Sequence, residues 1–205
     1  MRLIGLIFLI FSGILPGTAG TLSTPFAANT SQDGIMFDVV VNATMPLLVT
    51  QLALNLADGF DGTIQIYEKS GGFAGYETDS NAWTLIDTLN NVVSAGTNQP
   101  TIVDPADFLL PASSTSALYI TDTSGFNLQY TSGGSIGQVV ASNDDLSILE
   151  GVGKEYPFGY TTTQGRKWDG TIYYQLDPTG VPEPSSMALI ALGGLGLAVL
   201  RRRAA

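Results

Sequence analysis

The residues that do chemistry in most enzymes and metal sites are absent from this 205-residue chain, apart from scattered carboxylates. The sequence has no histidine and no cysteine. This excludes Ser-His-Asp and Cys-His nucleophile systems, disulfides, and zinc sites with His or Cys ligands. Two carboxylates could still hydrolyse a glycosidic bond, and the candidates for such a pair are Glu68, Glu77, Asp79, Glu150 and Glu155. The sequence gives no separation between them, so we expect no enzyme.

Two acidic segments offer the oxygen donors that calcium prefers, residues 58–62 and residues 143–145. Neither has the ligand spacing of an EF-hand loop, and Asp followed by Gly is typical of hairpin turns. We therefore expect turns at both places and no resident cofactor. A structural calcium ion in one of them remains an alternative.

Aromatic side chains in loop-rich stretches are the candidates for ligand binding. Trp83, Trp168 and Tyr76 could stack on the faces of sugar rings, which would make the chain a carbohydrate-binding module. The alternative is that both tryptophans fill the core and the tyrosine lies at its rim. Sequence does not decide between the two.

The charge of the chain excludes another class of partner. Residues 20–180 contain four basic and 17 acidic residues, a net charge of −13. A protein that binds nucleic acid needs a basic surface to displace counterions from the phosphates, and this region has none. We therefore expect no nucleic-acid partner and no attraction of this region to anionic lipid.

The hydrophobic pattern of the central region predicts an all-β fold. Apolar residues alternate in Ile35, Phe37, Val39 and Val41 and again in Leu48, Leu52, Leu54 and Leu56, with Thr50 between them. Further strands are predicted at 63–68, 82–88, 101–103, 117–121, 126–130, 136–141, 146–149 and 171–176. About ten short strands with Gly-rich turns favour an antiparallel β-sandwich of the jelly-roll-like kind. The segment Gly151-Val152-Gly153-Lys154 lacks the glycine spacing of a phosphate-binding loop and is predicted to be a turn.

The N-terminal 19 residues have the order of a secretory signal peptide. Arg2 precedes an apolar run over residues 3–15, Pro16 ends that run, and Gly17-Thr18-Ala19 supplies the small residues that a signal peptidase recognises. We predict cleavage after Ala19, so that residues 20–180 form the exported domain.

The C-terminal residues 181–205 combine three features in order. Pro182-Glu183-Pro184 excludes helix and keeps the chain extended. The uncharged residues 187–200 follow, and as a helix they span about 21 Å, short of a hydrocarbon core of about 30 Å. Arg201, Arg202 and Arg203 then hold the end of the chain in the cytoplasm by the positive-inside rule. We predict a single, marginal transmembrane helix at 187–200.

These residues resemble the PEP-CTERM sorting signal of Gram-negative bacteria that make exopolysaccharide. The resemblance covers about the last 25 residues. It implies that an exosortase, a membrane-bound processing enzyme, recognises Pro182, Glu183 and Pro184. It also implies that residues 187–200 are a transient inner-membrane anchor and that Arg201–Arg203 stop transfer. The exported part would then pass to the cell surface or the extracellular matrix.

Together these expectations describe an exported, non-enzymatic surface protein. Its partners would be signal peptidase, an exosortase-type enzyme and, before processing, the membrane. The expected role is structural or interactive in the exopolysaccharide layer of a biofilm matrix. The alternative is a lectin-like module that binds polysaccharide, with or without calcium.

Overall fold

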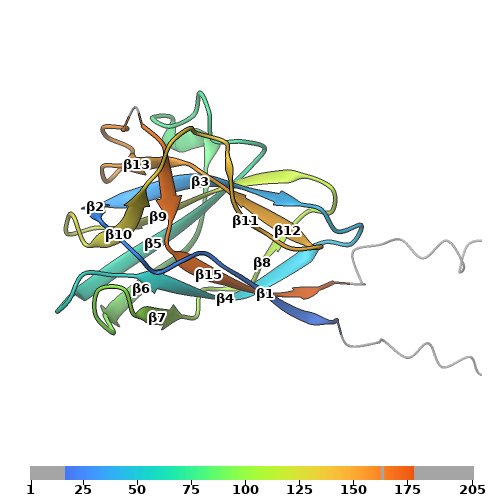
Figure 1. Cartoon of the computed structure of the whole chain (residues 1–205), viewed down its shortest axis with the longest axis horizontal. Coiled ribbons are helices and arrows are strands. Elements are labelled where there is room, and N and C mark those ends of the chain that lie inside the picture. Colours follow the sequence, from blue (N-terminus) through green and yellow to red (C-terminus); the bar gives the residue numbers. More distant parts are fainter. Residues whose placement is uncertain (1–16, 163, 178–205) are drawn as a thin grey trace, which may run out of the picture.

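A computed structural model describes residues 17–162 and 164–177, which form three antiparallel sheets (Figure 1). In this part of the chain there are 15 strands and one turn of 3-10 helix, η1 (Ser80–Ala82), and no α-helix. Every pairing between named strands is antiparallel. The predicted all-β, antiparallel fold is confirmed.

The first sheet, sheet A, has β4 near its centre. Its strands are β1 (Ala19–Ser23), β15 (Gly170–Leu176), β4 (Leu47–Asn55), β7 (Pro100–Val103) and β8 (Phe108–Leu110). The order is β1-β15-β4, and β7 and β8 pair with the two halves of the far edge of β4. The first and last described strands, β1 and β15, are therefore neighbours.

The second large sheet, sheet C, contains seven strands. They are β11 (Val139–Ser142), β12 (Leu146–Leu149), β3 (Gly34–Val41), β9 (Thr115–Asp122), β5 (Asp61–Ser70), β6 (Thr84–Val93) and β13 (Val152–Lys154). Strand β6 is one edge, and β13 pairs with the start of β3. The small sheet B comprises β14 (Arg166–Trp168), β10 (Leu128–Ser132) and β2 (Thr30–Gln32).

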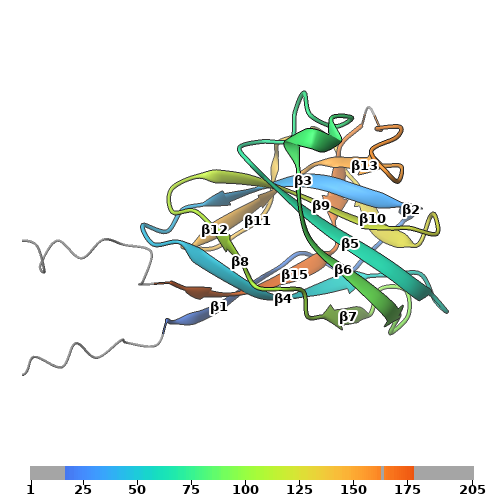
Figure 2. The same cartoon turned by 180° about the vertical axis from the view of Figure 1, so that it is seen from behind.

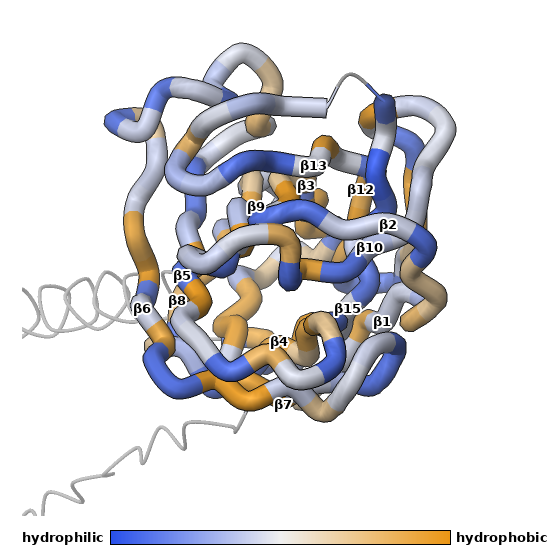
Figure 3. The backbone as a smooth tube through the Cα atoms, turned by 90° about the vertical axis from the view of Figure 1, so that its left-hand side faces the viewer, coloured by the Kyte–Doolittle hydropathy of each residue, from blue (hydrophilic) through white to orange (hydrophobic). Residues whose placement is uncertain are grey.

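One hydrophobic core joins the three sheets. Sheet A contributes Leu52 and Ile172, sheet C contributes Phe37 and Ile120, and sheet B contributes Trp168, all fully buried. Figures 1 and 2 show β4 and β15 in one layer and β3 and β9 in the other. In the end-on view of Figure 3, β2 and β10 lie between the two layers. Burial of the inward faces of both sheets is the main stabilising term of such a sandwich.

The predicted alternation is confirmed in β3 and corrected in β4. Ile35, Phe37, Val39 and Val41 of β3 all face the core. In β4 the core residues are Leu47, Val49, Leu52 and Leu54, whereas Leu48 is only half-buried. The register of β4 against β15 shifts between Tyr173 and Tyr174, so Thr50 is an extra residue in β4. This β-bulge reverses the side-chain alternation along the strand.

The predicted turn at Gly151-Val152-Gly153-Lys154 is wrong. Residues 152–154 form β13, which pairs with β3, and Gly151 exchanges backbone hydrogen bonds with Arg166. Both glycines are needed because the strand is closely packed. A Cβ atom at Gly151 would overlap the carbonyl oxygen of Met36, and one at Gly153 would overlap the hydroxyl of Tyr130.

Candidate functional site

Trp83 and Tyr76 lie together in the loop between β5 and β6. The indole Nε1 of Trp83 donates a hydrogen bond to the carbonyl oxygen of Tyr76 at 2.9 Å. Trp83 is 7% exposed, whereas Tyr76 is 44% exposed. The structure therefore brings two of the three predicted ligand-binding aromatics to one loop, but only Tyr76 is exposed to solvent.

The indole of Trp83 belongs to a second, smaller hydrophobic cluster. Its members are Met36, Phe73, Trp83, Ala117, Tyr119, Val152 and Phe158, with Tyr67 and Ala82 packed against them. Trp83 meets Tyr119 edge to face at a centroid distance of 6.1 Å. Met36 is next to Phe37 in β3 and so faces away from the main core. The cluster therefore fastens the loop 71–83 and the loop after β13 onto the outside of sheet C.

Lys69 occupies one face of the exposed Tyr76 ring. Its Nζ lies 4.1 Å from the ring centroid and donates hydrogen bonds to the carbonyl oxygens of Ser70 and Gly72. A cation held in this position competes with any other group for the same face of the ring. Tyr76 therefore offers little stacking surface to a sugar.

Trp168 lies in the main core and not in a binding site. Its side chain has an exposed fraction of 0%, and its ring stacks on Phe37 with centroids 4.7 Å apart. A side chain without accessible surface cannot contact a polysaccharide. The ligand-binding prediction for Trp168 is corrected to the core alternative.

The acidic segments hold turns together. The side-chain oxygen of Asn143 accepts the backbone N–H groups of Asp145 and Leu146, and Asp145 accepts the hydroxyl of Tyr174 at 2.8 Å. In the other segment the turn is confined to residues 58–59, where Gly59 has a φ of +72°, whereas Asp61 and Gly62 are the first residues of β5, so the turn expected there is wrong. Within residues 17–162 and 164–177, no group of three or more carboxylates is placed to hold a metal ion.

Three of the five candidate catalytic carboxylates accept backbone N–H groups in loops, and one of them, Asp79, accepts the N–H of Asn81 at 3.1 Å. The buried Glu150 accepts the backbone N–H of Gly134 at 2.8 Å and lies 3.7 Å from the ammonium of Lys167. Glu155 accepts the N–H of Tyr160 at 3.1 Å. None of the five lines either of the two grooves described next.

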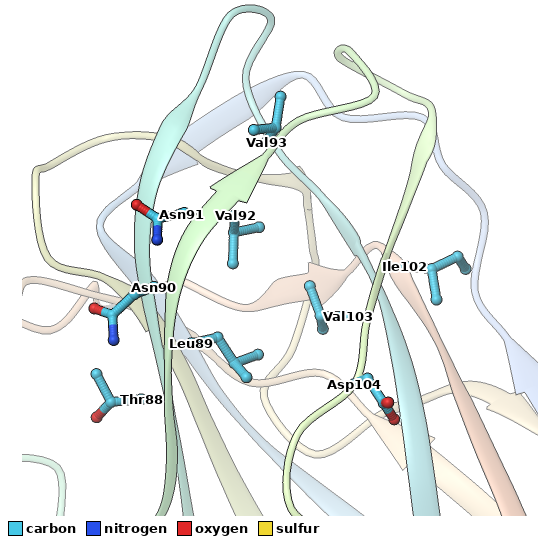
Figure 4. A pocket seen from close by; sticks show the side chains of 9 residues that line it. All are labelled: Thr88, Leu89, Asn90, Asn91, Val92, Val93, Ile102, Val103 and Asp104. Atoms are coloured by element: carbon cyan, nitrogen blue, oxygen red, sulfur yellow. The ribbon is translucent and has the colours of Figure 1, made fainter.

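A groove of about 370 Å³ separates the edge strands β6 and β7 (Figure 4). It is lined mainly by Leu89, Asn91, Val92, Ile102 and Val103. An exposed sheet edge can pair with another strand, but the edge strand β6 is interrupted by bulges. Register shifts in the pairing with β5 show that β6 bulges near Ile86 and again at Asn90–Asn91. Bulges of this kind protect an edge from strand addition.

A second groove, of about 300 Å³, lies on the outer face of sheet A. It is lined by Ala19, Gly20, Thr21, Thr50, Gln51, Tyr173, Tyr174 and Gln175. The five strands of sheet A contain no Asp, Glu, Lys or Arg. Sequence reasoning missed this surface because it treated charge only as a total for residues 20–180. The sequence does contain five segments without charged residues that could have indicated this surface, but only the strand pairing shows that they form one sheet.

The residues of the predicted sorting signal lie outside the described part of the chain. These are Pro182, Glu183, Pro184, Arg201, Arg202 and Arg203, together with the predicted helix at 187–200; most of the predicted signal peptide is outside as well. Ala19, the predicted cleavage position, is the first residue of β1 and pairs with Gln175. In the part of the chain that the structure describes, no helix is long and apolar enough to cross a membrane.

Comparison with protein families identifies one segment of the chain. Residues 180–203 match the family model of the PEP-CTERM protein-sorting motif. The chain therefore carries this motif, which overlaps the predicted sorting signal. Comparison with curated proteins gives no match.

Among solved structures, the chain is similar to VP2 proteins of infectious bursal disease virus. For a mutant VP2 in derived T=1 particles the identity is 14%, covering 99% of this chain and 52% of that one, with a TM-score of 0.30. For the Gx strain the identity is 16%, the coverage 94% and 51%, and the TM-score 0.26. The chain thus spans about half the length of these viral proteins. The fold described above rests on strand pairing alone.

Proposed function

We propose that this chain is an exported protein of the cell surface or extracellular matrix, with a structural or interaction role in the exopolysaccharide layer. The PEP-CTERM motif at residues 180–203 carries the proposal. It implies export, a transient membrane anchor and processing by an exosortase-type enzyme. Signal peptidase would remove residues 1–19 at the other end.

The two ends of the described domain support display from a single attachment side. Ala19 of β1 pairs with Gln175 of β15, and the backbone N–H of Leu176 donates to the carbonyl oxygen of Thr18 at 3.1 Å. The start of β1 and the end of β15 therefore lie side by side (Figure 1). Both processing steps act next to this end, so they leave the opposite end and the outer face of sheet A free for partners, whereas loops cover part of the outside of sheet C.

The proposed role is non-enzymatic, and the domain is proposed to be a jelly-roll-like sandwich. Histidine and cysteine are absent from the sequence. The carboxylates of Glu150 and Glu155 are engaged by backbone N–H groups of neighbouring loops. Successive strands β3 and β4 lie in opposite sheets, and β4 pairs with the distant β15, which is the kind of connection that jelly rolls contain.

A lectin-like function is the second candidate. The uncharged groove on sheet A favours it, because hydroxyl, amide and tyrosine side chains are the groups that bind sugars. This function is compatible with the first, since a matrix protein that binds polysaccharide is held in the matrix by that contact.

The sorting step is tested by replacing one carboxylate. In the producing bacterium, wild-type protein recovered from the surface should lack residues 187–205 by intact-mass analysis. Glu183→Ala should leave an uncut form in the inner-membrane fraction. The matched control is Asp144→Ala, which removes an exposed carboxylate of the domain and should be processed as wild type. Surface protein that retains Arg201–Arg203 would contradict the proposal.

A further inference from the structure

We propose that the outer face of sheet A around Tyr173 binds a neutral polysaccharide chain. This inference rests on the proposed function in one respect, because the exopolysaccharide layer would supply the ligand. The binding itself is a property of the folded domain and does not depend on sorting.

Charge is distributed unevenly between the two large sheets. The region 20–180 has a net charge of −13, yet none of the five strands of sheet A carries a charged side chain. Sheet C, in contrast, carries charged residues in β3, β5, β6, β9 and β13. The strands therefore give this face no ionic attraction of their own for polyanions or polycations, and the nearest charge along β15 is the carboxylate of Asp177, two residues after Gln175. The partner that this face suits is therefore uncharged.

The side chains that share the outer face of sheet A around Tyr173 suit a sugar. Ile172 and Tyr174 of β15 point into the core, so Tyr173 and Gln175 point outward. Thr21 of β1 and Gln51 of β4 lie opposite Tyr173 on either side. The ring of Tyr173 offers a π-face to the C–H groups of a sugar, and the amides and hydroxyl donate and accept hydrogen bonds with its hydroxyl groups.

The bulge in β4 brings a further polar side chain to the outer face. Val49 and Leu52 both face the core, and the extra residue places Thr50 and Gln51 together on the outer side between them. The hydroxyl of Thr50 donates to the carbonyl oxygen of Tyr173 at 3.5 Å. The bulge thus adds a polar side chain beside Tyr173 at the groove of about 300 Å³. This volume is at the lower end of the range for small-ligand sites, as a short stretch of a sugar chain requires.

A second copy of this chain is the rival occupant. Ile102 and Leu109 lie on the same outer face and are each about half exposed, at 52% and 49%. They belong to β7 and β8, which pair with the other edge of β4. The groove itself is lined by hydroxyl, amide and small side chains together with tyrosine. A stable protein interface has an apolar, closely packed centre, so this lining favours the sugar chain.

The experiment measures retardation of the full chain, in mild detergent, by polysaccharides in native gels. The neutral probes are dextran, laminarin and xyloglucan, and alginate is the acidic probe. Cleavage after Ala19 would leave the α-amino group of Gly20 beside the groove, so the chain is also tested without residues 1–19. We expect at least one neutral polysaccharide to retard both forms and alginate to retard neither.

The variants locate the site. Tyr173→Ala and Gln51→Ala should each weaken binding of the neutral polysaccharide about tenfold or more, while Tyr173→Phe should retain most of it. The matched control Tyr76→Ala removes an exposed tyrosine in the loop between β5 and β6, away from sheet A, and should bind as wild type. An unchanged midpoint of thermal unfolding shows that a variant is folded. If a variant is not folded, Thr21→Ala, which lies on the exposed side of β1, is tested in its place.

Four outcomes would overturn the proposal. The first three are no retardation by any neutral probe, retardation by alginate instead, and loss of binding in Tyr76→Ala but not in Tyr173→Ala. The fourth is concentration-dependent dimerisation that Tyr173→Ala abolishes, which would assign the face to a second copy. None of these outcomes bears on the intact-mass test of sorting, so failure of the binding site and failure of the proposed function are distinguishable.

Discussion

The indole ring of Trp168 lies nearly parallel to the phenyl ring of Phe37, with an interplanar angle of 14° and centroids 4.7 Å apart. Trp168 comes from β14 of the small sheet, and Phe37 comes from β3 of sheet C. The position two residues after Trp168 is glycine, because a Cβ atom at Gly170 would overlap the indole. This stack attaches sheet B to the core of the sandwich.

The first prediction concerns the stability that this stack provides. Trp168→Ala should lower the free energy of unfolding by about 3–5 kcal/mol, because it leaves a large cavity among fully buried side chains. Chemical denaturation followed by circular dichroism measures the change. Trp168→Phe keeps an aromatic ring and should cost less. Equal midpoints for wild type and Trp168→Ala would contradict the role of the stack.

The regular strands could be predicted from sequence because their residues alternate between core and surface. In β3 the alternation of Ile35, Phe37, Val39 and Val41 is unbroken, and the predicted strand 146–149 coincides with β12. A period of two residues is a direct consequence of strand geometry. It needs no knowledge of which strands pair.

The remaining features depend on contacts between distant parts of the chain. The strands β1, β2 and β8 are three to five residues long and were not predicted, because so short a segment carries little periodicity. The bulge at Thr50 is set by the pairing of β4 with β15. The groove on sheet A could not be predicted for the same reason. Thr21, Gln51 and Tyr173 come from three strands that only the pairing makes neighbours.

The second prediction concerns the glycine before β13. Gly151→Ala should lower the free energy of unfolding by about 2–4 kcal/mol, because the new methyl group would overlap the backbone of Met36 in β3. The matched control is Gly134→Ala, since the atom nearest to a Cβ there is Oε1 of Gln138 at 3.9 Å. Thermal unfolding of the two variants side by side checks the prediction. Similar midpoints would show that β13 moves away from β3 at little cost.

The third prediction concerns Tyr174, which fastens the β11–β12 turn to sheet A. Its hydroxyl donates to Asp145 at 2.8 Å and accepts from the side chain of Asn143 at 2.9 Å. At pH 7, Tyr174→Phe should lower the free energy of unfolding by about 1–2 kcal/mol, because both partners lose a hydrogen bond. Equilibrium denaturation of both proteins measures this loss.

The same residue should give the stability a dependence on alkaline pH. Burial, and then the hydrogen bond to Asp145, raise the pKa of Tyr174 from 10.0 to about 12. The unfolded chain therefore loses this proton first. The contribution of Tyr174 is complete below pH 10 and is lost as the pH rises from 10 to 12. The difference between wild type and Tyr174→Phe should shrink over that range. A difference that stays constant to pH 12 would show that the hydroxyl titrates normally.

The fourth prediction concerns Asp169, a buried carboxylate that joins three parts of the fold. Its Oδ2 accepts hydrogen bonds from the backbone N–H of Ala27 at 3.1 Å, the hydroxyl of Thr131 at 3.1 Å and the side-chain amide of Asn55 at 3.3 Å. Asp169→Ala would remove an acceptor from all three donors; the hydroxyl of Thr131 also has the carbonyl oxygen of Ala27 at 3.0 Å, and the amide of Asn55 also has the side-chain oxygen of Asn98 at 3.0 Å. This substitution should lower the free energy of unfolding by about 2–4 kcal/mol at pH 7.

Asp169→Asn separates the charge of this group from its hydrogen bonds. Burial raises the pKa of Asp169 above its ordinary value of 3.8, against the lowering effect of its hydrogen bonds. The native state therefore holds the proton more tightly than the unfolded chain. The part of the stability that depends on this proton is complete below pH 3.8 and is lost as the pH rises through the native pKa.

Asparagine does not titrate, so the advantage of wild type over Asp169→Asn should be largest near pH 3 and smaller at pH 7. Urea denaturation at both pH values measures the two differences, with the exposed Asp144→Asn as the control that should equal wild type. If the advantage of wild type grows with pH, the charged form is the one that the native state prefers, and burial does not dominate at this site.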